Sequence, residues 1–232
     1  MRRAVIFILC LALLSGCQAS DIRSYWNDVP LLEADIRLSE DRFADFAELA
    51  IAAPEADALA AMDVLFDRLT QDSVAYYVYS EWVDGAFYNP LSPCRSASLY
   101  GKAVERMVAD AVLELNECEP FLQRREWIEY NQPGAPATVP GCASFDSRTL
   151  VLVLDLSCPS CRQALERLSS DSQWAGLRHV AVCCGRGTKP DVPGWEYLFP
   201  ENFTVVFDPH VTPIYFLVAA DGSVEHGYTP AF

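Results

Sequence analysis

The sequence has few basic residues. Only 17 of its 232 residues are lysine or arginine, against 32 aspartates and glutamates, and it has three histidines, so its formal net charge is −15. Binding to nucleic acid needs a basic surface that neutralises phosphates, so this composition argues against a nucleic-acid partner. An acidic chain is also not attracted to anionic lipid headgroups. Attachment to a membrane would therefore depend on a covalent anchor.

The apolar run at the start of the chain is too short to span a bilayer as a mature helix. It extends from Ala4 to Leu14 and follows the basic residues Arg2 and Arg3, a pattern that predicts an export signal. The next residues, Ser15-Gly16-Cys17, complete a segment that resembles the lipobox of bacterial lipoproteins. In that motif the cysteine becomes the lipidated first residue after cleavage. We therefore expect a signal peptide at residues 1–16.

Removal of this peptide would leave 15 basic and 32 acidic residues, a net charge of −17. We expect Cys17 to carry the lipid anchor and residues 17–30 to form a tether. An aspartate after the cysteine would indicate inner-membrane retention in some bacteria, but Gln18 occupies that place. The predicted location is thus the cell envelope, facing the periplasm, with the outer membrane favoured over the inner membrane.

The chain has nine cysteines, of which Cys10 leaves with the signal peptide and Cys17 is lipidated. Export permits disulfides, and an odd number of remaining thiols requires at least one unpaired thiol or an intermolecular bond. Outside the pair Cys158–Cys161, sequence does not decide the pairing, which leaves open Cys94, Cys118, Cys142, Cys183 and Cys184.

Residues 31–131 have helical apolar spacing, which predicts a domain of four or five helices. Ser39 is the expected N-cap of one helix, and Asn89–Pro93 interrupts the pattern before a long helix that begins near Ser96. Three prolines and two glycines in residues 132–141 then predict an extended linker. A second domain is expected at residues 142–232.

In this second domain the pattern changes to buried strands. The apolar runs 150–156 and 179–183 flank a helix that follows Cys161, which predicts a parallel, right-handed β-α-β unit. A short irregular segment containing the apolar run 203–207 comes next. The turn Asp221-Gly222 then lies between two further runs and predicts a terminal β-hairpin. The expected class is α/β, a mixed central sheet with flanking helices, preceded by an all-α domain.

A pair of cysteines, Cys158-Pro159-Ser160-Cys161, lies where the first strand meets the helix. A helix N-terminus stabilises the thiolate, which is the reactive form of cysteine. Cys161 would lie one turn further along and could resolve a mixed disulfide formed by Cys158. The alternative is half of a zinc site, for which Cys183-Cys184 could supply the second ligand pair.

Together with Val211-Thr212-Pro213-Ile214, the cysteine motif resembles thioredoxin-fold proteins of the periplasmic, membrane-tethered type. The resemblance implies that Pro213 is cis and faces the cysteines, that Thr212 and Pro213 contact substrate, and that a redox-active Cys158–Cys161 disulfide replaces any other cofactor. The order of a helical region, a Pro/Gly connector and this motif is similar to Bacteroidetes lipoproteins in which an uncharacterised helical domain precedes a thioredoxin-like one.

The sequence departs from the thioredoxin pattern in three places. Ser157 replaces the usual tryptophan before the first cysteine, and Leu152 lies near the position of the usual buried acid. Asp155 could transfer protons instead, although an aspartate at a strand end more often is solvated or caps a turn. The usual C-terminal helix is missing before Phe232, so we expect either that the helical domain covers that face of the sheet or that the face is open.

Cys183 and Cys184 are expected at the same sheet edge as Cys158. They could be bystanders, an auxiliary redox pair, or part of a soft-metal site with the cysteine motif, to which His210 could contribute. Three functions follow. The first is an enzyme, a thiol-disulfide oxidoreductase of undetermined direction, whose partners are exported proteins with thiols or disulfides and a membrane redox protein. The second is a copper or other soft-metal chaperone. The third is a non-catalytic, partner-binding surface lipoprotein with a structural disulfide.

Overall fold

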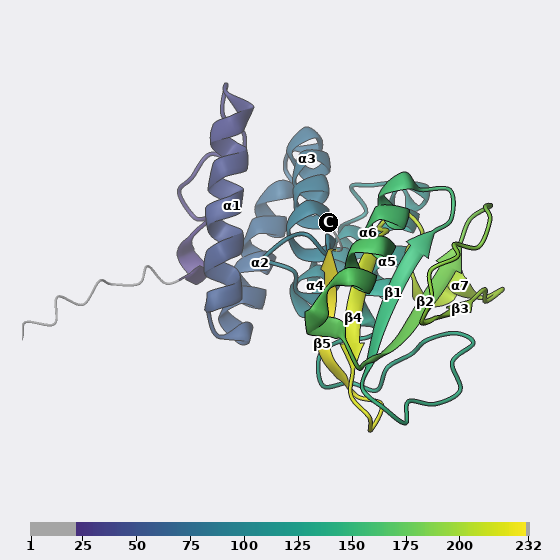
Figure 1. The fold of residues 1–232 in the computed structure, drawn as a ribbon. Coiled ribbons are helices and arrows are strands. Elements are labelled where there is room, and N and C mark those ends of the chain that lie inside the picture. The colour runs from purple at the N-terminus through teal and green to yellow at the C-terminus, as the bar shows by residue number, and fades with distance from the viewer. Residues whose placement is uncertain (1–21, 231–232) are drawn as a thin grey trace, which may run out of the picture.

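A computed structural model describes residues 22–230 and places a helical region beside a β-sheet (Figure 1). The predicted signal peptide and the lipidation site Cys17 lie outside the described residues. None of the helices within residues 22–230 combines the length and the apolar character needed to cross a bilayer.

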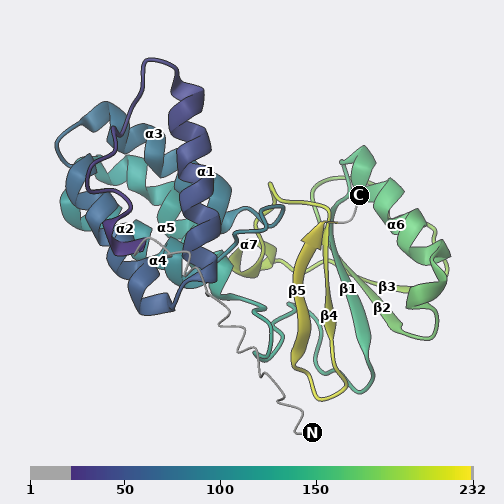
Figure 2. The ribbon, with the colours of Figure 1, turned by 90° about the vertical axis from the view of Figure 1, so that its left-hand side faces the viewer.

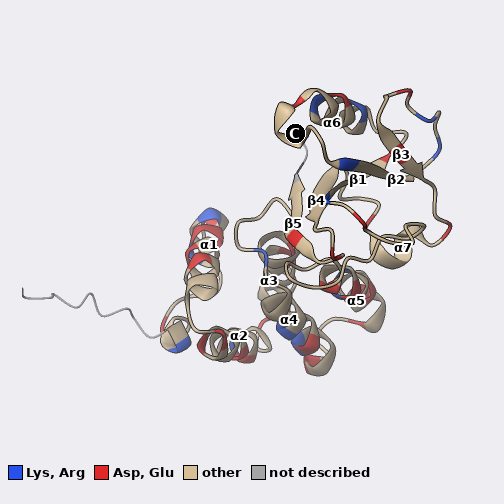
Figure 3. Ribbon diagram, turned by 60° about the horizontal axis from the view of Figure 1, so that its bottom comes forward, with Lys and Arg blue, Asp and Glu red and all other residues tan. Residues whose placement is uncertain are grey.

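The helical region is built from five α-helices among the described residues before the sheet. They are α1 (Ile36–Ala52), α2 (Glu55–Leu69), α3 (Ser73–Val83), α4 (Ala97–Asp110) and α5 (Leu115–Glu129), with a 3-10 turn η1 (Ile22–Ser24) and a π-helical segment η2 (Asp84–Tyr88). Apolar side chains spaced three and four residues apart on these helices form one core. Acidic residues are spread over the outer helices, α1 and α2 included (Figure 3).

Polar side chains start three of these helices. Asp35, Asp72 and Ser96 accept N–H bonds from the first turns of α1, α3 and α4, which confirms the helix start near Ser96. The predicted N-cap Ser39 is wrong. Ser39 lies inside α1, buried, and its hydroxyl accepts the N–H of Glu33 at 2.8 Å, because Asp35 already caps the helix one turn earlier.

The proposed tether at residues 17–30 ends earlier than expected. Trp26 is fully buried in the helical core and packs edge-on against Phe46 and Tyr79. The guanidinium of Arg68 donates to the carbonyls of Trp26 and Val29, which holds this segment against α2. Residues from Ile22 onward therefore belong to the helical region, because the buried Trp26 ring holds this segment in the helical core.

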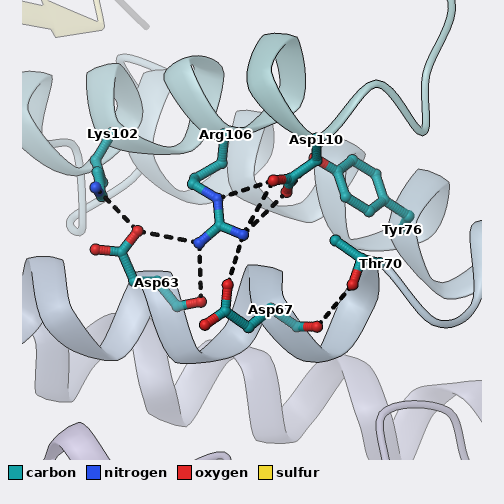
Figure 4. Close-up of polar contacts among 7 residues, drawn as sticks. All are labelled: Asp63, Asp67, Thr70, Tyr76, Lys102, Arg106 and Asp110. Atoms are coloured by element: carbon teal, nitrogen blue, oxygen red, sulfur yellow. Dashed lines mark hydrogen bonds and ion pairs between the residues drawn. The ribbon is translucent and has the colours of Figure 1, made fainter.

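Arg106 on α4 is the centre of an ionic network with α2 (Figure 4). Its guanidinium contacts carboxylate oxygens of Asp63 at 3.1 Å, Asp67 at 2.7 Å and Asp110 at 3.0 Å. Lys102 also pairs with Asp63, at 2.9 Å. One arginine thus holds three aspartates, and without it their charges would repel one another.

The C-terminal region is a five-stranded mixed sheet in the order β3-β2-β1-β4-β5. Its strands are β1 (Thr149–Asp155), β2 (Arg178–Cys184), β3 (Trp195–Leu198), β4 (Ile214–Val218) and β5 (Val224–Pro230), with helices α6 (Pro159–Ser170) and α7 (Phe203–Val206) and a 3-10 turn η3 (Ser172–Trp174). β1, β2 and β3 are parallel, β4 is antiparallel to β1, and β5 is antiparallel to β4. The expected β-α-β unit, terminal hairpin and fold class are confirmed.

The two faces of the sheet are covered by different elements. α6 covers one face, on the side away from the helical region, and α7 lies between the sheet and the helices (Figure 2). The indole N–H of Trp127 on α5 donates to the carbonyl of Thr204 in α7, at 2.8 Å. The second face is therefore not open. α7 and residues 130–145 cover it, and the helical region packs behind α7.

The Pro/Gly linker at residues 132–141 is ordered by the terminal hairpin. The N–H of Gly134 donates to the carbonyl of Val224, and the N–H of Val224 donates to the carbonyl of Ala135, both at 2.8 Å. The connector therefore pairs with the start of β5, beside the edge of the sheet, and ties the hairpin to the end of α5.

Candidate redox site

The cysteine motif lies at the junction of β1 and α6. Cys158 is the N-cap of α6 and Pro159 its first residue, a position that suits proline because its missing N–H has no partner there. Cys158 is half-buried, whereas Cys161 is 1% exposed and packs with the leucines of β1 and α6. The two thiols, which are both reduced here, therefore differ in their access to solvent.

The thiol of Cys158 is surrounded by hydrogen-bond donors. Partial burial favours its neutral form, but bonds from the Ser160 hydroxyl, the Cys161 thiol and the N–H groups of both residues outweigh this and lower the pKa of Cys158. The Ser160 Oγ lies 2.9 Å from the Cys158 Sγ. Cys158 is thus the thiol that ionises more readily, as an attacking nucleophile requires.

Burial raises the pKa of the Cys161 thiol to about 12, although the N–H of Asp155 donates to its sulfur at 3.4 Å. The Thr212 side chain acts on the pKa of Cys161 in the lowering direction but does not offset the effect of burial. A thiol in this setting stays protonated until another group approaches it. That protonation suits a resolving residue.

The peptide bond between Thr212 and Pro213 is cis, as predicted, and Ile214 begins β4 directly after it. The Thr212 side chain acts on the pKa of the Cys161 thiol, so this loop lies close to the cysteine pair. The sequence predicted this proximity from the resemblance alone. The role of both residues in substrate contact remains a prediction.

The carboxylate of Asp155 contacts Ser157 and not the thiols. Its Oδ1 accepts both the backbone N–H and the hydroxyl of Ser157, each at 2.7 Å. These bonds close an Asx turn before Cys158. Asp155 therefore caps a turn, as aspartates at strand ends often do. Only the backbone N–H of Asp155 bonds to Cys161, so a part for its carboxylate in proton transfer stays a prediction.

Two glycines after β2 let a loop pass close to this turn. Gly185 has φ +75°, and a Cβ there would collide with the Asp155 carboxylate. A Cβ on Gly187 would lie 2.7 Å from the Cβ of Leu156 and 2.8 Å from its carbonyl oxygen. The sequence analysis identified neither glycine, because the approach depends on the tertiary arrangement of two loops.

Cys183 and Cys184 lie on opposite faces of the sheet. Cys183 packs in the same apolar cluster as Cys161, and burial raises its pKa to about 12. Cys184 pairs with Asp155 in the β1–β2 register and packs on the other face, and burial raises its pKa to about 11. Because successive strand residues point in opposite directions, only Cys183 lies on the side of the redox pair.

Within the described residues, no group of three or more histidine, cysteine, aspartate or glutamate side chains is arranged to hold a metal ion. The four-cysteine metal site considered from sequence is therefore not assembled. His210 is exposed, and its backbone N–H donates to the Asp208 carboxylate at 2.8 Å. His210 therefore lies in the turn that precedes the cis proline.

A shallow groove of about 280 Å³ begins at Cys158. It is lined by the turn from Leu156 to Pro159 and by Arg162, Gln163 and Glu166 on the first turns of α6. Such an open groove can accept an extended segment of another protein, and it leaves the Cys158 sulfur accessible to a disulfide or thiol.

The fold is shared with a protein of known structure. No family model matches the chain, and no curated protein does. A crystal structure of a thioredoxin-like protein from Bacteroides caccae is similar, with a TM-score of 0.68 and 19% sequence identity, over 90% of this chain and 87% of that chain. This coverage includes both the helical region and the sheet. The chain therefore has a thioredoxin-like fold, with a helical region that precedes the sheet.

Proposed function

We propose that this protein is a thiol-disulfide oxidoreductase that acts on exported proteins. Cys158 is the nucleophile, Cys161 is the resolving thiol, and Thr212 and Pro213 form the edge on which a substrate peptide docks. The observation that carries the proposal is the asymmetry of the two thiols. One is accessible with a lowered pKa, and the other is buried with a pKa raised to about 12.

In the reducing direction, the Cys158 thiolate attacks one sulfur of a substrate disulfide. A mixed disulfide forms, and the other substrate sulfur leaves as a thiolate that takes up a proton. Cys161 then loses its proton and attacks the Cys158 sulfur, which releases the second substrate thiolate. The substrate gains two electrons, and the protein keeps a Cys158–Cys161 disulfide. The reverse sequence oxidises a substrate dithiol, and an external dithiol or disulfide protein restores the starting state.

A Cys161→Ser variant tests this proposal, because it blocks the resolving step. We expect mixed disulfides with exported proteins to accumulate on Cys158 in the native host and to disappear on reduction. A Cys158→Ser/Cys161→Ser double variant is the matched control and should trap nothing. The proposal fails if no adducts form and if dithiothreitol does not reduce the wild-type pair. Stoichiometric Cu(I) binding without exchange would instead support the chaperone function.

We also propose that Cys17 is lipidated and anchors the protein at the periplasmic face of the cell envelope. The support is the sequence pattern of residues 1–17 alone. A Cys17→Ser variant is expected to lose labelling by radioactive palmitate and to leave the membrane fraction, whereas a Cys94→Ser variant should keep both properties. Equal labelling of the Cys17→Ser variant and the wild type would disprove the anchor.

A further inference from the structure

A buried hydrogen bond joins the helical region to the loop that carries the cis proline. Tyr88, the last residue of η2, is 5% exposed, and Asp208, four residues before Thr212, is 6% exposed. The Tyr88 hydroxyl donates to the Asp208 Oδ2 at 2.8 Å. A hydrogen bond to a buried carboxylate is stronger than a neutral one, and loss of the donor leaves the acceptor unsatisfied.

Asp208 also shapes the segment that leads to the cis proline. Its Oδ1 accepts the N–H of His210 at 2.8 Å, and its carbonyl accepts the N–H of Val211 at 3.4 Å. The first of these bonds closes an Asx turn. One carboxylate therefore holds the turn with one oxygen and the helical region with the other. Thr212, the first residue of the cis Thr212-Pro213 bond, follows this turn directly.

Tyr88 is itself fixed by the helical region. Its ring packs on the ring of Tyr100 with centroids 5.3 Å apart, and the guanidinium of Arg124 lies 5.9 Å above it. Its carbonyl accepts a bond from the Arg95 Nε at 3.3 Å, and Arg95 in turn lies over the ring of Tyr228 on β5. η2 is also π-helical, a rare conformation that occurs often at functional sites.

We propose that Tyr88 is a positioning residue for the loop from Asp208 to Pro213. Through Asp208 it holds Thr212 and Pro213 in place, so the helical region determines how tightly the site binds a substrate peptide. The substrate part of this inference rests on the proposed function. Tyr88 does not touch the thiols, so its loss should weaken peptide docking and leave the intrinsic reactivity of Cys158 unchanged.

A comparison of Tyr88→Phe with Tyr100→Phe tests the inference. The Tyr100 hydroxyl donates to the Asp84 carboxylate at 2.8 Å, a bond of the same kind that stays within the helical region. For Tyr88→Phe we expect about tenfold faster hydrogen exchange at the His210 and Val211 amides, and about a fivefold rise in KM for a disulfide-containing peptide, the size of one lost hydrogen bond. Alkylation of Cys158 by iodoacetamide should stay at the wild-type rate. Tyr100→Phe should match the wild type in all three measurements.

An Asp208→Asn variant gives a second, independent result. Asparagine can keep both bonds, since its oxygen accepts the His210 N–H and its amide donates to the Tyr88 hydroxyl. Because these bonds are neutral and weaker, we expect exchange and KM to lie closer to the wild type than to Tyr88→Phe. The inference is wrong if Tyr88→Phe and Tyr100→Phe behave alike, or if Asp208→Asn is as impaired as Tyr88→Phe. If the wild type exchanges no disulfide, the proposed function fails, while hydrogen exchange still decides whether Tyr88 holds the loop.

Discussion

Iodoacetamide is expected to alkylate Cys158 at least about a thousandfold faster than Cys161 in the reduced protein at pH 7, because only the thiolate reacts. The pKa of Cys161 is raised to about 12, so roughly one molecule in 100 000 has this thiol ionised at that pH. The pKa of Cys158 lies below its usual value near 9, so at least about one molecule in 100 is ionised there. The ratio of these fractions sets a lower limit on the ratio of rates, because burial of Cys161 also hinders access of the reagent.

Mass spectrometry after timed alkylation measures this difference. Trypsin leaves both thiols on the peptide 149–162, so fragment ions must assign the label. The rate at Cys158 should rise with pH and level off once the thiol is fully ionised, whereas the rate at Cys161 should still be rising at that pH. A Ser160→Ala variant lacks the hydroxyl that lowers the Cys158 pKa, and its profile should move to higher pH. Equal rates at the two cysteines would contradict the assignment of nucleophile and resolving thiol.

Much of the sheet could be predicted because its central strands are buried on both faces. β1 and β2 are nearly continuous apolar runs, and the Asp221-Gly222 turn marks the hairpin. β3 and α7 could not be predicted. β3 has four residues of which only Trp195 is buried, so its apolar pattern is weak. The residues of α7 are aromatic and β-branched, and the segment is helical where it packs between β2 and α5.

The candidate site, too, could be predicted from the sequence only in part. Local sequence identifies Cys158 and Cys161, because a strand, two thiols and a helix are consecutive in the chain. Local sequence does not show contacts between segments that are far apart in the chain. Nothing in the sequence near Tyr88 indicates that its hydroxyl meets Asp208, 120 residues later. The helical region looked like a separate domain for this reason, although it contacts the loop that leads to the cis proline.

The largest expected loss of stability comes from Arg106→Met. The side chain of Arg106 is 15% exposed and that of its partner Asp110 is 11% exposed, so removal of the cation leaves a largely buried carboxylate without its main partner. Asp63 and Asp67 add like charges nearby, and Lys102 can compensate only Asp63. Breaking a buried ion pair from one side destabilises by about 3–5 kcal/mol. Asp67 is well exposed, so solvent screens its charge. We therefore expect Arg106→Met to lower the free energy of unfolding by about 3 kcal/mol, the lower end of this range.

Thermal unfolding followed by circular dichroism measures the effect, with an expected fall in Tm of about 6–12 °C for a chain of this size. Arg37→Met is the matched control. Arg37 pairs with Asp35 at 3.0 Å, but the two side chains are 81% and 46% exposed, so its loss should leave Tm nearly unchanged. Arg106→Lys keeps the charge and loses the planar fork that reaches three carboxylates at once, so its Tm should lie between the wild type and Arg106→Met. If Arg106→Met unfolds at the same temperature as Arg37→Met, desolvation of the network offsets its attraction, and the network does not stabilise the helical region.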